Sequence, residues 1–290
     1  NRIVLLSFVH QPFSDDKLPG MTFGQWGAHI DRNVTWFKPG RAWTQYLARS
    51  QYLLQQGEFA ADVLCFAGEA SPNGGVAAKD IKSAGYDYDA CGTDIFAKLK
   101  VDNGDIVLPS GRRYRLLVMP KTPFQAVHIA AKIRDLVAAG GAVLSEKPKH
   151  SPTLTGFPAS ENQMLAIADK VWGDCDGKTV KSNRYEKGII FSGISAAEAL
   201  THLKVAPAVQ LPEPLAWIHR RTDDTDIFFV SNQSGKPVHT IAGFLAAGKE
   251  PEFFDAEQGA IRPAAGWTVK GKHVRLPLNL APEKSVFIVF

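Results

Sequence analysis

The residues from Thr22 to Phe37, TFGQWGAHIDRNVTWF, carry the densest set of side chains in this sequence that could do chemistry. Two indole rings, a histidine, an acid, a cation and an amide lie close together there: Trp26, His29, Asp31, Arg32, Asn33 and Trp36. The stretch has neither the period of an amphipathic helix nor the alternation of a strand, which indicates a loop. Carboxylate and amide oxygens suit a hard cation, and aromatic rings suit an apolar ligand face. The pattern predicts a loop that contacts a ligand, and the next question is which elements hold it.

Composition limits the class of protein. The chain has 290 residues, of which 45% are hydrophobic and 21% charged, as in a globular protein with one large domain or several small ones. The formal net charge is +4 and no basic stripe is present, so no nucleic-acid partner is expected. No apolar run approaches the roughly 20 residues that span a bilayer, so no membrane partner is expected. The three cysteines have no CxxC spacing, and neither a zinc site nor a disulfide framework is indicated.

The first segment, residues 1–57, has the pattern of one βα unit. Ile3 to Val9 is a short continuous apolar run, which fits a strand covered on both faces, as in parallel sheets and barrels. After a loop rich in Gly and Pro, the stretch from Trp43 to Gly57 predicts a helix whose apolar side includes Tyr46 and Leu54. In barrels the loop after a strand is where active sites are built, so the position of the dense loop fits a binding role.

The second segment, residues 58–204, alternates strands and helices. VDNGDIVLPSG predicts a hairpin with its turn at Asn103-Gly104. The other predicted elements are buried strands at Ala61 to Glu69, Tyr114 to Pro120 and Ala142 to Pro148, and a helix at Ala126 to Gly141. This order implies right-handed crossovers and a small parallel sheet with helices on both faces.

The third segment, residues 205–290, predicts an antiparallel β-sandwich region because its strands are short, its turns frequent and its helix signals few. Two strands, Ala216 to Arg221 and Asp226 to Asn232, are joined by a turn at Asp223-Asp224. A second hairpin surrounds Glu257 to Gly259, and the last strand runs from Ser285 to Phe290.

The sequence opens with NRIVLLSFV and has no Met at its start, already inside a strand-like run. We therefore expect a piece of a longer polypeptide, or a chain trimmed at its N-terminus, so the compartment cannot be read from this end. The partner expected for the first segment is then the rest of its own polypeptide.

Several stretches together resemble glycoside hydrolase family 106, the α-L-rhamnosidase family of large multidomain bacterial enzymes. They are NRIV followed by HQP, PGMTFGQWGAHIDRNVTWF, YLARSQYLLQQGEFAADVLCFAGE, GYDYD, YRLLVMP, WIHRRTDDTDIFFVSNQ and LPLNLAPEKSVFIVF. The resemblance covers nearly the whole chain and is most specific in the first 70 residues.

The resemblance implies a fold of class α/β plus β. Residues 1–57 would be the last βα unit of a (β/α)8-type catalytic barrel, or TIM barrel. Residues 58–204 would form a flavodoxin-like domain, similar in shape to class I glutamine amidotransferases, and residues 205–290 a β-sandwich-like region.

The resemblance also implies a function. The family cleaves terminal α-L-rhamnose with inversion, and calcium helps to hold the sugar. Inversion needs two carboxylates about 6.5–9.5 Å apart. Because these usually sit on middle and late barrel strands, the catalytic acid and base are expected upstream of Asn1 and are unknown here. A rhamnose-containing glycan is the expected substrate, and a periplasmic or extracellular location is favoured. No organic cofactor is expected.

Eight residues are the candidates for contact with the sugar: His10, Gln11, Trp26, His29, Asp31, Arg32, Asn33 and Trp36. His10 and Gln11 would lie at the barrel mouth, where they could meet sugar hydroxyls or, through Gln11, a metal; alternatively His10 only caps the strand. Asp31 and Asn33 could bind hydroxyls or calcium, or Asp31 could pair with Arg32 to brace the loop.

The remaining candidates have structural alternatives as well. Trp26 or Trp36 could stack on a sugar ring, or anchor the loop by packing. His29 could be a general base, although a lone histidine in a loop is more often structural. No metal ligand set is assigned.

A non-catalytic carbohydrate-binding or structural module is the alternative to the enzyme. A third option, an amidotransferase-like enzyme, needs a nucleophilic cysteine in a strand-to-helix turn. Cys65 lies inside a predicted strand instead, which favours a buried small hydrophobic residue and a supporting role for its domain.

Overall fold

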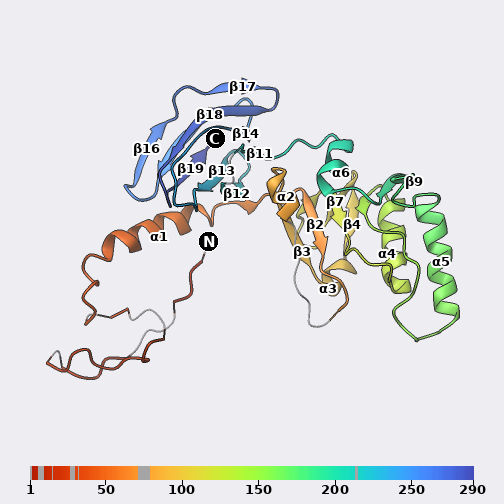
Figure 1. Cartoon of the computed structure of the whole chain (residues 1–290), viewed down its shortest axis with the longest axis horizontal. Coiled ribbons are helices and arrows are strands. Elements are labelled where there is room, and N and C mark those ends of the chain that lie inside the picture. The colour runs from red at the N-terminus through yellow and green to blue at the C-terminus, as the bar shows by residue number, and fades with distance from the viewer. Residues whose placement is uncertain are drawn as a thin grey trace.

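The fold is described from a computed structural model, which covers residues 2–5, 10–14, 16–26, 30–31, 33–70, 79–212 and 215–290. Three parts follow one another along the chain and are seen in Figure 1: an N-terminal arm that ends in helix α1, an α/β domain, and two antiparallel sheets near the C-terminus, which lie beside α1. None of the described helices is long and apolar enough to cross a membrane.

The α/β domain is built on a six-stranded sheet in which five neighbouring strands are parallel and one edge strand is antiparallel. In spatial order these are β3 (Tyr88–Cys91), β2 (Val63–Phe66), β7 (Leu116–Val118), β8 (Ala142–Leu144), β10 (Gly188–Phe191) and β9 (Ser182–Tyr185). The predicted parallel sheet is therefore present, although its strands are shorter than predicted because the ends run into loops.

Helices cover both faces of this sheet, as predicted. Alternate residues of each strand point to opposite faces, so Leu64 and Phe66 share a buried cluster with α4 (Val127–Ala138) and α5 (Ala159–Trp172). Val63 and Cys65 share the other cluster with α2 (Lys79–Ser83) and α6 (Ala196–His202). The elements α5, β9, β10 and α6 have no counterpart in the sequence prediction.

A small three-stranded sheet, β4 (Lys100–Asp102), β5 (Asp105–Val107) and β6 (Arg113–Tyr114), follows the short helix α3 (Thr93–Phe96). The predicted hairpin is confirmed, because β4 pairs antiparallel with β5. Its turn residues Asn103 and Gly104 have φ of 50° and 86°. Both values lie in the left-handed region that a two-residue Asn-Gly turn requires.

The C-terminal part contains two antiparallel sheets. The six-stranded sheet has the order β1 (Glu58–Phe59), β12 (Ala216–Arg221), β13 (Asp226–Ser231), β19 (Ser285–Val289), β15 (Glu252–Asp255) and β16 (Ala260–Pro263). The four-stranded sheet has the order β11 (Val209–Gln210), β14 (Val238–Leu245), β18 (His273–Leu280) and β17 (Thr268–Lys270). Side chains from both sheets form one buried cluster that includes Phe228, Phe244 and Leu276.

Helix α1 (Arg41–Leu53) packs on the six-stranded antiparallel sheet, as Figure 1 also shows. Tyr46 and Leu54, on the side predicted to be apolar, join the cluster of Ile227 and Phe287. The Tyr46 hydroxyl lies 2.9 Å from Ser285 Oγ. Segments that lie more than 200 residues apart in the sequence therefore share a core, which the sequence analysis did not predict.

The predicted strand from Ile3 to Val9 is not formed by those of its residues that the structure describes. Ile3–Leu5 are exposed and belong to no strand, and residues 6–9 lie outside the described residues. A strand is held by hydrogen bonds to its neighbours, and the described residues offer this stretch no neighbouring strand.

Replacing Phe228 by Ala tests the core that the two antiparallel sheets share. Phe228 is fully buried and touches the rings of His219, Phe244 and Phe290. We expect the free energy of unfolding in urea to fall by about 3–5 kcal/mol, because the cavity cannot collapse between two sheets. Ile261→Ala, at an exposed position, is the control and should change it by less than about 0.5 kcal/mol. Equal effects of the two substitutions would contradict a shared core.

Candidate functional site

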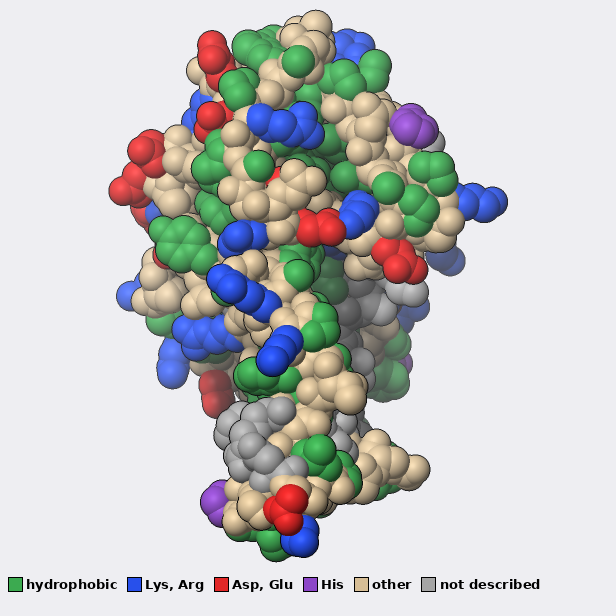
Figure 2. All heavy atoms as spheres, turned by 90° about the vertical axis from the view of Figure 1, so that its left-hand side faces the viewer, with side chains coloured by type: hydrophobic (Ala, Val, Ile, Leu, Met, Phe, Trp, Pro, Cys, Tyr) green, Lys and Arg blue, Asp and Glu red, His purple; other side chains and the backbone are tan. Residues whose placement is uncertain are grey.

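The candidate site lies in the N-terminal arm, between residues 10 and 37. The arm stands away from the body of the molecule in Figure 1, and Figure 2 shows it as a narrow projection below the body. Large apolar side chains are exposed along it, among them Leu18, Phe23, Trp26 and Phe37. A surface of this kind indicates contact with another surface or ligand.

Gln11 organises the loop. Its Nε2 donates to the Met21 carbonyl oxygen at 2.7 Å, and its Oε1 accepts from the Met21 backbone nitrogen at 2.9 Å. The side chain thus occupies both backbone hydrogen-bonding groups of Met21, as a neighbouring strand would. Gly20 lies directly beside it with φ of 78°, and a Cβ there would meet Gln11 Oε1 at 2.0 Å. Only glycine fits this approach and this backbone conformation.

Asp31 closes the other side of the loop. Its Oδ2 accepts from Gln11 Nε2 at 3.0 Å and its Oδ1 accepts from the Asn33 backbone nitrogen at 2.7 Å. The Asn33 side chain in turn donates to the Pro19 carbonyl oxygen at 3.4 Å. Hydrogen bonds therefore bring together three of the predicted site residues, Gln11, Asp31 and Asn33. The same hydrogen bonds hold the loop in its shape.

The other predicted residues are placed differently. His10 is exposed, Trp26 is 63% exposed, and Trp36 is 38% exposed with its ring edge-on to Trp43, the centroids being 6.2 Å apart. An exposed indole such as Trp26 can stack on a ligand ring. His29 and Arg32 lie outside the described residues, so the pairing of Asp31 with Arg32 stays a prediction.

The described residues of the loop do not by themselves assemble a calcium donor set, and the calcium expectation stays a prediction. Both Asp31 carboxylate oxygens already accept hydrogen bonds from amides of the loop. In the part of the chain that the structure describes, no three His, Cys, Asp or Glu side chains come together as a metal site would require. Hard cations such as calcium take six or more oxygen ligands, so these residues do not make a calcium site by themselves.

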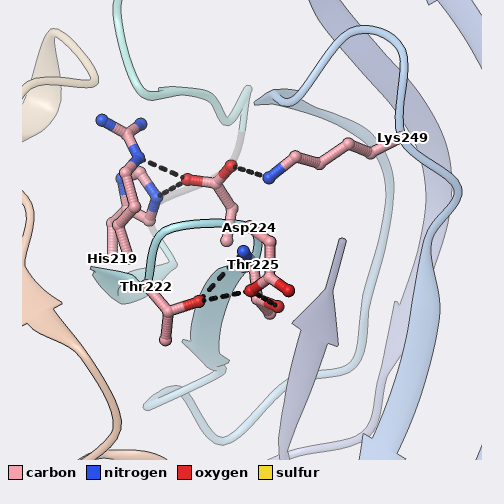
Figure 3. Close-up of polar contacts among 7 residues, drawn as sticks. His219, Thr222, Asp224, Thr225 and Lys249 are labelled. Carbon is pink, nitrogen blue, oxygen red and sulfur yellow. Dashed lines mark hydrogen bonds and ion pairs between the residues drawn. The ribbon is translucent and has the colours of Figure 1, made fainter.

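A second polar cluster, which sequence analysis did not predict, surrounds Asp226 on β13. Figure 3 shows His219 and Lys249 directed toward one carboxylate. The oxygen Oδ1 of Asp226 lies 2.7 Å from His219 Nε2 and 2.8 Å from Arg221 Nε, and Oδ2 lies 2.8 Å from Lys249 Nζ. The Asp226 backbone also exchanges two hydrogen bonds with Phe290, at 3.0 and 2.9 Å.

The pKa values of this cluster follow from burial and pairing. Burial alone would raise the pKa of Asp226, but hydrogen bonds from His219, Lys249 and Arg221 outweigh it and hold the pKa below its usual value. Burial lowers the pKa of His219, so the neutral ring donates from Nε2 at neutral pH. Because every oxygen of the carboxylate is engaged by the protein, this cluster stabilises the hairpin and is not arranged for catalysis.

One signal in the sequence could have found part of this cluster. The turn at Asp223-Asp224 fixes a register in which Arg221 faces Asp226 across the hairpin. Opposite charges that face each other across two strands attract. The turn is held by Thr222, whose Oγ1 donates to Asp224 Oδ1 at 2.9 Å and accepts from the Thr225 nitrogen at 3.0 Å (Figure 3). Lys249 arrives from a distant loop, and no local pattern indicates it.

Cys65 does not act as a nucleophile. Its side chain is 2% exposed within β2, and burial raises the pKa of its thiol to about 12. The reactive form of cysteine is the thiolate, which such a site does not stabilise. All three cysteines of the chain are buried and unpaired.

Comparison with known proteins agrees with the resemblance in the sequence. The family model of glycoside hydrolase family 106, described as alpha-L-rhamnosidase, matches residues 1–268, and the chain belongs to this family. A protein of Formosa agariphila named "Putative beta-glucuronidase" is 34% identical over 290 residues, which are 100% of this chain and 24% of that protein.

Among solved structures, a rhamnosidase is again similar to this chain. The structure of a rhamnosidase from Novosphingobium sp. PP1Y has a TM-score of 0.83 and 26% identity, over 93% of this chain and 26% of that one. A beta-galactosidase from Bacillus circulans sp. alkalophilus has a TM-score of 0.55 and 11% identity, over 91% of this chain and 47% of that one, and is alike in fold alone. The chain spans about a quarter of the length of the Formosa and Novosphingobium proteins.

Replacing Gln11 by Leu tests the bracing of the loop. Leucine can neither donate to the Met21 carbonyl nor accept from its nitrogen, so we expect the Met21 amide to exchange with solvent roughly five- to tenfold faster, as for loss of a hydrogen bond worth about 1 kcal/mol. Hydrogen exchange followed by NMR measures this. Gln25→Leu, at an exposed position of the same loop, is the control and should leave the Met21 rate unchanged.

Asp226→Asn tests the second cluster. The amide keeps the shape of the carboxylate but leaves Lys249 and Arg221 without their anion, so we expect a loss of about 3 kcal/mol in the free energy of unfolding at neutral pH. Chemical denaturation measures this loss.

The effect of Asp226→Asn should depend on pH. Since the folded pKa of Asp226 lies below the unfolded value, its stabilisation is complete above the unfolded pKa of about 3.8 and is lost as the pH falls further. The gap between the two proteins should therefore narrow in acid. Asp224→Asn, in the exposed turn, should cost less than about 1 kcal/mol, and a gap that widens in acid would contradict the assignment.

Proposed function

We propose that this chain is part of an inverting α-L-rhamnosidase, in which it forms one wall of the sugar pocket and the accessory domains. The observation that carries the proposal is the family match over residues 1–268. The TM-score of 0.83 to a rhamnosidase supports it. The substrate is a rhamnose-containing glycan or glycoside.

The N-terminal arm supplies the pocket wall in this proposal. Its exposed apolar side chains would be covered by the rest of the same polypeptide, whose relatives are about four times longer than this chain. The segment from 1 to 57 then completes a catalytic barrel, with Ile3 to Val9 gaining its strand neighbours from the preceding chain. A loop that holds a ligand in a fixed geometry needs such support from the rest of the protein.

The roles of Gln11 and Asp31 in the arm follow from their contacts, and those of the other candidates are proposed from their side-chain chemistry. Gln11 and Asp31 hold the loop in shape, since their polar atoms already bond to each other and to the backbone. Trp26 offers an exposed indole face, and His10 offers an exposed ring at the start of the arm. We assign Trp26 to stacking on the sugar, and His10, with His29, Arg32 and Asn33, to its hydroxyl groups.

The acid and the base of the reaction lie outside this chain in our proposal. Inversion requires one carboxyl that protonates the leaving oxygen and another that activates a water on the opposite face. Within the described arm, Asp31 is tied to the loop by two hydrogen bonds. Any calcium ion that helps to hold the sugar takes its ligands from elsewhere in the polypeptide.

The two remaining parts are accessory domains. The parallel strands have the order 2-1-3-4-5 when numbered along the chain, which supports a flavodoxin-like domain within residues 58–204, although β1 at its start pairs with β12 of the C-terminal sheet. Two antiparallel sheets around one core support a β-sandwich over residues 205–290. We propose that both domains support the barrel. We also propose that the protein acts in the periplasm or outside the cell, where glycan substrates occur.

A second substrate class is favoured by one observation. The relative that is 34% identical to this chain is named as a beta-glucuronidase, so a glucuronide is the alternative sugar. The family match and the rhamnosidase structure favour rhamnose.

The test is to compare the 290-residue chain with the longer polypeptide that contains it, using aryl α-L-rhamnoside and aryl β-glucuronide. We expect the longer protein to release the aryl group from the rhamnoside alone, and the 290-residue chain to release none from either. Proton NMR of the first product formed should show β-L-rhamnose, the inverted anomer. Hydrolysis by the 290-residue chain would overturn the placement of the catalytic carboxylates, and cleavage of the glucuronide alone would overturn the substrate.

A further inference from the structure

A cleft of about 640 Å³ lies where the α/β domain meets the C-terminal sheets, well away from the N-terminal arm in sequence. Its lining comes from β1 and the residues after it, from the loop and strand at β6, and from β12; it includes Phe59, Asp62, Arg112, Tyr114, His219 and Arg221. The volume falls in the range of small-molecule pockets, and such pockets often lie between domains.

Asp62 is the unusual residue of this cleft. Its backbone is fixed, because its carbonyl oxygen accepts from the nitrogens of Arg115 and Leu116 at 2.8 and 3.2 Å. Its side-chain carboxylate makes no hydrogen bond or ion pair with any described residue, and the residue is half-buried in the wall of the cleft. The carboxylate therefore keeps its hydrogen-bond acceptors for solvent or for a ligand in the cleft.

The charges around Asp62 agree with this reading. Burial raises the pKa of Asp62 to about 6, and Arg221 and Arg115 lower it while Asp87 raises it. At neutral pH the carboxylate is therefore ionised and has hydrogen-bond acceptors to spare. A titratable group with such a pKa in a cleft is a candidate for binding.

Two arginines bring unused donors to the same cleft from different domains. In the described contacts Arg221 uses only Nε, for Asp226, and its side chain is 52% exposed. Arg112 uses one terminal nitrogen, 3.3 Å from Asp89 Oδ2, and is 37% exposed. Arg113 differs, because its guanidinium is engaged by Asp102 and Asp105.

We propose that this cleft is a second saccharide-binding site, in which Asp62 accepts hydrogen bonds from neighbouring hydroxyl groups of a neutral sugar unit and Arg112 and Arg221 donate to its oxygens. A hydroxyl group both donates and accepts, so a sugar matches a carboxylate flanked by guanidinium groups. The choice of a sugar rests on the proposed function, whereas the unpaired carboxylate and the unused donors do not.

The competing ligand is an anion held by the two arginines. An anionic group in the cleft would face the ionised Asp62, and like charges at short range repel. Removing the charge of Asp62 therefore separates the two ligands: it weakens the binding of a neutral sugar and strengthens the binding of an anion.

The experiment titrates the 290-residue chain with L-rhamnose, with a rhamnose-containing oligosaccharide and with inorganic sulfate, by calorimetry at a pH well above the pKa of Asp62. We expect sugar binding that Asp62→Asn weakens by roughly tenfold or more, and that Arg112→Ala also weakens, since both remove charge-assisted hydrogen bonds. Asp94→Asn, the same change at an exposed carboxylate on α3, should leave the affinity unchanged. Absence of sugar binding, an unchanged affinity in Asp62→Asn, or sulfate binding that this variant strengthens would each overturn the proposal.

Thermal unfolding of the same variants shows whether a loss of binding is caused only by a loss of the fold. Because the folded pKa of Asp62 is raised, the stability it contributes in acid is lost as the pH rises from the unfolded value, about 3.8, through about 6. Asp62→Asn should therefore unfold at a higher temperature than the parent at neutral pH. A lower unfolding temperature would reveal a partner for Asp62 and overturn the proposal.

The two proposals can fail separately. In the longer polypeptide, Asp62→Asn should bind the oligosaccharide more weakly at the cleft yet keep its kcat on a small aryl rhamnoside. If the longer protein cleaves no rhamnoside, the proposed function fails while binding by the 290-residue chain still decides the cleft. Loss of kcat in Asp62→Asn, with the fold intact, would make the cleft part of the reaction site and overturn its separate role.

Discussion

The structure depends on β12, the strand through which its three parts are joined. β12 pairs with β1, which leads out of α1, and with β13 of the C-terminal hairpin. Arg220 on this strand donates to the carbonyl oxygens of Gln56 and Gly57, both at 2.6 Å, and so fixes the chain between α1 and β1. Lys82 of the α/β domain donates to the Trp217 carbonyl oxygen at 2.8 Å and lies 3.8 Å from the centre of its indole ring.

The middle strands of the six-stranded antiparallel sheet are covered on both faces. The four-stranded sheet packs on one face and α1 on the other, which leaves no apolar face of β13 or β19 in water. The arrangement places the end of the arm at a fixed point on the molecule. A loop that binds a ligand needs such a fixed point, because its side chains must be held within fractions of an ångström of their working positions.

Two carboxylates, one buried and one half-buried, show how the surroundings decide the use of one chemical group. Asp226 has three cationic or imidazole donors around it, and its pKa is lowered in spite of burial. Asp62 has no such donor within bonding distance among the described residues, and its pKa is raised to about 6. The first stabilises a hairpin, whereas a raised pKa is expected to make the second reduce stability at neutral pH. Groups that reduce stability are those most often kept for function.

Local patterns in the sequence determined much of this protein: the helix of α1, the Asn103-Gly104 turn, the parallel sheet with helices on both faces, the strands β12 and β13, and family membership. These features depend on residues close together in the chain, where periodicity and turn chemistry act. The sequence also indicated the arm as a binding loop, and hydrogen bonds join Gln11, Asp31 and Asn33 of that prediction. Tertiary structure alone decided that α1 packs on the C-terminal sheet, that Lys249 reaches Asp226, and that Asp62 is left unpaired between two domains. Each of these depends on which distant residues share one small volume, and burial and pairing there set the charge and the role of a side chain.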